Sequence, residues 1–196
     1  AMALSSTVAH AYMLIDVLWV NSGLTVTTTT SQNINSVAFP ARCKDGTANG
    51  EGLMIGVLTT TANTNAAVIN NSTISYTNQA GTAGRTATLA NLVGMQFPVS
   101  PAIGTIVWFR LAAGDTGVRS IQTITLGTSL AAGAIAVLVA RPLWAQSTNP
   151  INSGQWQTPA QNPGVRLFNG TCALLCYTAS ATTATTVIGG ITVMER

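Results

Sequence analysis

Charged residues are scarce in this sequence. They make up 7% of the chain, against roughly 25% in ordinary globular domains. Eight Lys and Arg and five Asp and Glu leave a net charge of +3, and they are scattered singly. Helical bundles and coiled coils need charged outer faces, and nucleic-acid binding needs clustered basic residues, so both classes are excluded. Low charge is typical of a subunit with permanent contacts in an assembly, and a threonine-coated monomer is the alternative.

Long hydrophobic runs are also missing, although 47% of the residues are hydrophobic. The longest run, Leu130–Ala140, is broken by Gly133 and is much shorter than the roughly 18 to 20 residues that span a bilayer. The hydrophobic content excludes intrinsic disorder. Ala1–Ser6 contains no basic stretch followed by an apolar core, so we expect no secretory signal.

Cysteine is rare, and its count of three is odd for a disulfide framework. Cys172 and Cys176 are four residues apart in a segment that reads as extended, where their separation would be roughly 13 Å, too far for a disulfide. We therefore expect free, buried thiols and a protein made in a reducing cytosol.

Alternating apolar and hydroxyl-bearing residues predict β-strands along nearly the whole chain. Leu24–Thr30 is rich in β-branched residues, and the continuously apolar Ala134–Ala140 is typical of a strand buried on both faces. The other predicted strands are 12–20 (where a short helix also fits), 53–61, 67–77, 105–111, 118–126, 171–177 and 185–194. Short strands with Gly-containing turns predict an all-β fold, an antiparallel two-sheet β-sandwich that is jelly-roll-like, with a β-barrel as second choice.

No internal repeat or composition boundary divides the chain, so we predict a single domain, 1–196. We expect residues 1–11 to form an N-terminal arm that is ordered by a neighbouring subunit. Residues 142–164 are rich in Pro, Asn, Gln and Ser and predict a long loop. Trp144 and Trp156 in this loop are predicted to contact a partner, although both would also fit as caps on the core of their own domain.

The sequence offers little for catalysis. Its single histidine, His10, lies near the start of the chain, and no serine stands in a G-x-S-x-G motif. The close acidic pair Asp45 and Glu51 lies in a Gly-rich turn, and metal-ligating residue types are scattered. Asp115 lies four positions before Arg119, and we predict a local ion pair between them that braces a turn. We therefore predict no enzymatic activity and no catalytic, cofactor-binding or metal-binding residue.

Two segments carry more information than composition alone. Residues 74–86 read ISYTNQAGTAGRT and residues 113–120 read AGDTGVRS. In order and spacing they resemble two stretches of a family of tailed-bacteriophage virion structural proteins. The resemblance covers roughly residues 50–143. It implies a structural role in a virus particle and no catalytic residues.

Together with the low charge, this resemblance leads us to expect a bacteriophage capsid decoration (cement) protein that stabilises the head by bridging capsomers. A tail, collar or fibre-attachment component is the alternative, and a receptor- or carbohydrate-binding β-sandwich with Trp144 and Trp156 at a sugar site is a further one. The expected partners are other copies of the chain, as a trimer, and the major capsid protein or another virion protein, with no nucleic acid and no membrane. The expected location is the capsid surface of the virion, after synthesis in the host bacterial cytoplasm.

Overall fold

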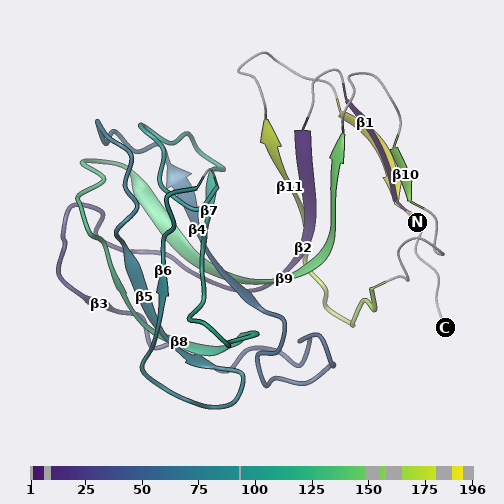
Figure 1. Cartoon of the computed structure of the whole chain (residues 1–196), viewed down its shortest axis with the longest axis horizontal. Helices are drawn as coiled ribbons and strands as arrows, with labels where there is room; N and C mark the ends of the chain where they lie inside the picture. Colours follow the sequence, from purple (N-terminus) through teal and green to yellow (C-terminus); the bar gives the residue numbers. More distant parts are fainter. Residues whose placement is uncertain are drawn as a thin grey trace. The chain divides into compact units, whose positions relative to one another are not determined.

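The computed structural model describes residues 2–6, 10–92, 94–148, 155–157, 165–179 and 187–191, and every regular element among them is a β-strand (Figure 1). No helix in these ranges is long and apolar enough to cross a membrane. The strands are β1 (Met2–Ser6), β2 (His10–Asn21), β3 (Gln32–Asn33), β4 (Met54–Thr61), β5 (Thr73–Asn78), β6 (Arg85–Thr88), β7 (Ile106–Phe109), β8 (Val118–Thr125), β9 (Ala134–Thr148), β10 (Gln155–Gln157), β11 (Ala173–Ala179) and β12 (Val187–Ile191).

The chain divides into two compact units rather than the single predicted domain, 1–196. Unit 1 comprises Ala1–Ile15 and Pro142–Arg196, and unit 2 comprises Asp16–Arg141. Strands β2 and β9 each contribute residues to both units. Composition marks a boundary only where a linker lies, and a continuous strand carries no such mark.

Unit 2 is a sandwich of two antiparallel four-stranded sheets. One sheet has the strand order β2-β9-β4-β7 and the other has the order β3-β8-β5-β6. Numbered along unit 2, these are strands 1-8-3-6 and 2-7-4-5, which is the strand order of a jelly roll. The predicted all-β, jelly-roll-like sandwich is confirmed, and the sheets do not close into a barrel.

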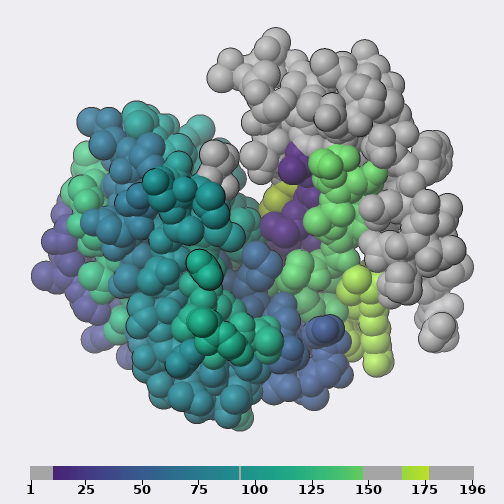
Figure 2. All heavy atoms as spheres, in the orientation of Figure 1, coloured from purple at the N-terminus to yellow at the C-terminus, as the bar shows by residue number. Residues whose placement is uncertain are grey.

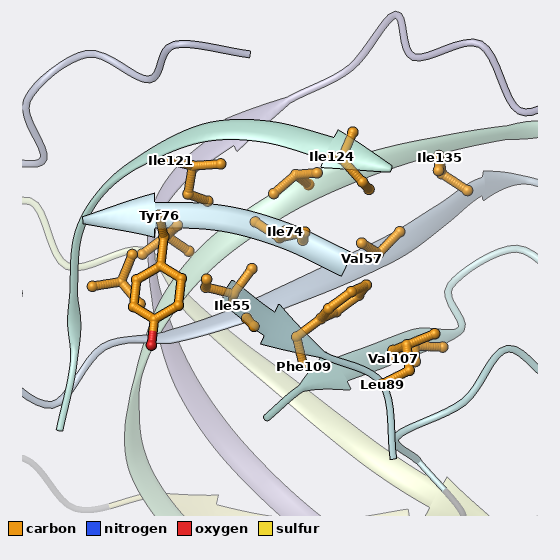
Figure 3. Close-up of a cluster of buried hydrophobic side chains, with 14 of the residues drawn as sticks. Ile55, Val57, Ile74, Tyr76, Leu89, Val107, Phe109, Ile121, Ile124 and Ile135 are labelled. Atoms are coloured by element: carbon orange, nitrogen blue, oxygen red, sulfur yellow. The ribbon is translucent and has the colours of Figure 1, made fainter. Parts of the chain in front are cut away.

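The hydrophobic core of unit 2 lies between its two sheets. In β5, Ile74 and Tyr76 are fully buried, whereas the alternate residues Thr73 and Ser75 are partly exposed. This is the alternation that the sequence displays. Figure 3 shows the inward side chains of β5 and β8 packed against those of β4 and β7.

Strand β8 departs from strict alternation because its pairing with β5 contains two β-bulges, at Gln122 and at Arg119. Each bulge adds one unpaired residue and changes which side chains face the core. Val118, Ile121 and Ile124 therefore all face inward at a spacing of three, and all are fully buried. Arg119 is exposed.

Strand β9 is buried on both faces, as predicted. Residues 135–140 are all buried, and β4 pairs with β9 from Thr61↔Ala134 to Met54↔Ala140. Both inward and outward side chains of this stretch are apolar, so either face can be covered without leaving a polar group unpaired.

The predicted loop 142–164 is partly strand, because β9 continues to Thr148 and Gln155–Gln157 form β10. Pro142 lies within β9 at the point where β4 no longer pairs with it, since the last pair is with Ala140. A proline there removes no hydrogen bond to β4. Pairing with β4 therefore stops before Pro142, while β9 itself continues to Thr148.

Unit 1 contains a three-stranded antiparallel sheet with the order β10-β1-β12. Its β1 pairs over its whole length with β12, from Met2↔Ile191 to Ser6↔Val187. Most of the predicted arm, 1–11, is thus strand: β1 and the start of β2. The partner strand lies far along the sequence, so no local pattern could predict the pairing. Strand β11 of the same unit is the outer strand of the five-stranded sheet β11-β2-β9-β4-β7.

Leu24–Thr30 was predicted as a strand and is not one. The side chain of Gln32 takes the place of a partner strand: its Nε2 donates to the Thr25 carbonyl at 2.9 Å, and its Oε1 accepts from the Thr25 N–H at 2.7 Å. Local side-chain bonding of this kind competes with sheet pairing and outweighs β-branched propensity.

Two glycines allow the backbones of two connections to touch. The Val118 N–H donates to the Gly50 carbonyl at 2.9 Å. A Cβ placed on Gly117 would lie 2.0 Å from that same carbonyl oxygen, and a Cβ on Gly50 would lie 2.2 Å from the Val118 oxygen. Only glycine fits at both positions, so the contact between the connections 34–53 and 110–117 depends on them.

We expect Gly117→Ala to lower the free energy of unfolding by about 3 kcal/mol, because backbone must move to admit the methyl group. Gly84→Ala is the control, since Gly84 has open space around its Cβ position and a φ of +71°. Its cost should be only about 1 kcal/mol, from the left-handed backbone. Chemical denaturation measures both, and equal losses would contradict the close approach.

Candidate functional site

The most concentrated polar cluster of unit 2 surrounds the carboxylate of Asp115, in the connection between β7 and β8. Asn78 Nδ2 donates to Asp115 Oδ1 at 2.8 Å, and Arg85 Nε donates to Oδ2 at 2.9 Å. The Tyr76 hydroxyl also donates to Oδ2 and accepts from the Ala112 N–H at 2.9 Å. Both carboxylate oxygens are therefore occupied by side chains of β5 and β6.

The pKa values of Asp115 and Tyr76 in this cluster lie far from neutral pH. The hydrogen bond from Arg85 is the largest cause that lowers the pKa of Asp115 to about 2. Burial is the largest cause that raises the pKa of Tyr76 to about 12, and its hydrogen bond to Asp115 adds to this. Neither group exchanges a proton near pH 7, so the cluster lacks the poised acid or base that catalysis requires. Its chemistry is that of a clamp between a hairpin and a connection.

The structure gives Asp115 a different partner from the one predicted. Among the described residues, Asp115 forms an ion pair with Arg85 and none with Arg119. Arg119 is the extra residue of a β-bulge and is exposed. A separation of four residues suggests a local pair, but the bulge reverses the expected side-chain direction.

The two segments singled out in the sequence, 74–86 and 113–120, meet in this cluster. Residues 74–86 form β5, the following turn and β6, and they supply Tyr76, Asn78 and Arg85. Residues 113–120 supply Asp115. Residues from both segments thus join the hairpin of β5 and β6 to the connection before β8.

A second carboxylate, Asp16, lies fully buried in β2 and was not identified as a site from the sequence. Arg42 Nε donates to its Oδ2 at 3.0 Å, and Arg42 NH2 donates to its Oδ1 at 3.2 Å. Arg141 NH2 lies 3.8 Å from Asp16 Oδ2, and its side chain is 3% exposed. The available signal was one charge inside an otherwise apolar strand, because a buried charge needs a partner.

The three cysteines form no disulfide, as expected from their spacing. Cys43 is buried and accepts from the Gly50 N–H at 3.2 Å, and burial is the largest cause that raises the pKa of its thiol. Burial also raises the pKa of Cys176. Cys172 is exposed rather than buried. None of this creates the electropositive surroundings that activate a thiol.

The two tryptophans predicted at a partner interface have different outcomes. Trp144 is 9% exposed in the single chain and packs with Tyr12 and Leu14. It therefore caps a core of its own chain, which was the alternative left open. The backbone of Trp156 pairs with Ala3 in the sheet of β1 and β10, and its side chain lies outside the described residues.

The carboxylate oxygens of Asp45 and Glu51 accept hydrogen bonds from other residues of unit 2. Asp45 Oδ1 accepts from the Thr47 N–H at 3.1 Å, and Asp45 Oδ2 accepts from Asn49 Nδ2 at 2.8 Å. Glu51 Oε2 accepts from the Thr116 hydroxyl at 2.8 Å. Within the described ranges, no three His, Cys, Asp or Glu side chains gather closely enough to hold a metal ion. The side chain of His10 is outside those ranges.

No family model, curated protein or solved structure matches the chain. The structure alone therefore defines the class of the protein. It is an all-β sandwich, with the jelly-roll strand order of unit 2 and the clamp around Asp115.

We expect Arg85→Gln to lower the free energy of unfolding at pH 7 by more than its control variant does, because it removes a charge-assisted hydrogen bond to Asp115. Arg119→Gln, the matched control, should stay within about 0.5 kcal/mol of the wild type. The pKa of Asp115 is lowered from 3.8 to about 2, so its stabilisation is complete above the unfolded value and is lost as pH falls through the folded one. The gap between wild type and Arg85→Gln should therefore narrow between these pH values in urea titrations; a gap independent of pH would refute the ionic role.

Asp16→Asn should be more damaging, at about 3 to 5 kcal/mol, because it leaves the buried Arg141 and the partly buried Arg42 without the carboxylate. Asp45→Asn removes a carboxylate of similar bonding at an exposed position and should cost much less. Denaturant midpoints compare the two variants, and similar losses would show that the buried cluster does not stabilise unit 2.

Proposed function

We propose that this chain is a non-enzymatic structural protein of a bacteriophage particle, a capsid decoration protein that bridges neighbouring capsomers. The single observation that carries the proposal is the use of the two family-like segments. Three of their distinctive residues, Tyr76, Asn78 and Arg85, donate hydrogen bonds to the fourth, Asp115, so these residues hold the fold together. A family signature made of such a clamp is expected when the shared property is the shape of the protein.

The fold and the charge support the same proposal. Jelly rolls recur in viral capsid proteins, although they also occur in lectins and cupins, so the fold alone does not decide function. A surface with few charges can be buried against neighbours without desolvating ions. A decoration protein would act mechanically: binding only the assembled shell stabilises the shell by mass action.

The alternatives have less support. The carbohydrate-binding alternative needs exposed aromatic side chains, and Trp144 is buried against Tyr12. A tail or collar component would share the composition and the fold, and only its place in the particle separates it from a decoration protein.

The proposal is tested on purified particles of the phage that encodes the chain. We expect quantitative mass spectrometry to find a copy number comparable to that of the major capsid protein, and gold-labelled antibody to decorate heads. Particles stripped of the protein should open at a lower temperature, and adding it back should restore the wild-type value. Labelling confined to tails, or a copy number far below that of the capsid protein, would favour the tail alternative; absence from particles would reject both.

A further inference from the structure

Nine of the ten charged residues of unit 2 lie at one end of the sandwich. That end consists of the connections 34–53, 79–84 and 111–117 and the strand positions beside them, and we call it the charged end. Its members are Asp16, Arg42, Lys44, Asp45, Glu51, Arg85, Asp115, Arg119 and Arg141. Arg110 lies apart from them, because its backbone pairs with Thr88, at the opposite end of β6 from Arg85. With five basic and four acidic side chains, the charged end has a net charge of +1.

The opposite end consists of the four connections 22–31, 62–72, 89–105 and 126–133, none of which contains a charged residue, and we call it the uncharged end. Antiparallel pairing places these connections together, since Thr61 pairs with Ala134 in one sheet. In Figures 1 and 2 the connections 62–72 and 89–105, blue to teal, form the upper surface of unit 2.

Hydrogen bonds join the four connections into one surface. The Leu130 N–H donates to the Val26 carbonyl at 2.9 Å, and the Thr64 N–H donates to the Leu130 carbonyl at 3.4 Å. The Ser100 N–H donates to the Asn65 carbonyl at 3.1 Å. Asn65 is buried, and its Nδ2 donates to two further backbone carbonyls at 2.8 Å. The surface is therefore preorganised, which lowers the entropic cost of an association.

This surface exposes large aliphatic side chains. Val68 is 45% exposed, Leu92 62%, Val99 52% and Ile103 69%. The bridge between Ile69 and Phe97 places Val68 beside the segment that contains Val99. Exposed aliphatic groups on a preorganised surface without charge are typical of a protein contact.

We propose that the uncharged end is a contact surface between copies of this chain. In a symmetric contact each surface meets its own equivalent, so any charge near the axis would face a like charge. The uncharged end carries no such penalty. The charged ends, each with a net charge of +1, then point away from one another. A partner bearing strong charge, such as a nucleic acid or an anionic lipid, finds no complementary group here. This inference does not depend on the virion role.

The test compares two aspartate substitutions of equally exposed residues. Ile103 at the uncharged end is 69% exposed, and Val37 in the connection 34–53 at the charged end is 68% exposed. We expect sedimentation velocity of the full chain to show concentration-dependent self-association. Ile103→Asp should raise the dissociation constant about tenfold or more, because a carboxylate would then face its own copy. Val37→Asp should leave it unchanged. High salt should not weaken the association, since it screens only the repulsion between charged ends.

Several results would overturn the proposal: a wild-type chain that stays monomeric, equal effects of the two substitutions, or an association abolished by salt. Circular dichroism reports whether Ile103→Asp is folded. If it is not, the near-isosteric Val99→Thr replaces it and should weaken association in the same direction. A map of the particle in which the uncharged end contacts another protein would reject self-association and leave the virion role intact. A self-associating chain absent from particles would do the reverse.

Discussion

The ion pair between Asp115 and Arg85 is the interaction on which the charged end of the jelly roll depends. It fastens the hairpin of β5 and β6 to the connection that leads into β8, and Tyr76 and Asn78 complete the coordination of the carboxylate. The side chain of Asp115 is 5% exposed, so little water competes with these donors. Beside it, the backbone contact of Gly50 with Gly117 joins the connection 34–53 to the same place.

The two ends of unit 2 solve the same structural problem with different chemistry. Each end must satisfy the backbone groups of long connections that leave the sheets. The charged end uses carboxylates and guanidinium groups, and buries Asp16 between Arg42 and Arg141. The uncharged end uses backbone bonds and the amide of Asn65. Amides satisfy the backbone at a lower desolvation cost than ions, so this end remains suitable for burial against another protein.

Predictions from the sequence were accurate where one strand's own residues decide the outcome. In β5 the alternating sequence places Ile74 and Tyr76 on one face, and both are buried; in the apolar Ala134–Ala140, residues 135–140 are buried as well. They were inaccurate where a distant residue decides. Gln32 keeps Leu24–Thr30 out of the sheet, and β12 pairs with the segment predicted as an arm. The Asp115 cluster combines residues up to 39 positions apart. Spacing along the sequence therefore could not identify Arg85 as the partner of Asp115.

What the sequence determined by itself was the class of fold, since periodic hydroxyl and apolar residues with so little charge suit an all-β fold of short strands. The scarcity of charge was also visible at once, but its distribution was not. Only the tertiary structure gathers nine of the ten scattered charges at one end of unit 2 and brings together, at the other end, connections that contain none. The reason is geometric: antiparallel strands bring alternate connections to opposite ends, so residues far apart in the chain become neighbours according to the order of the strands.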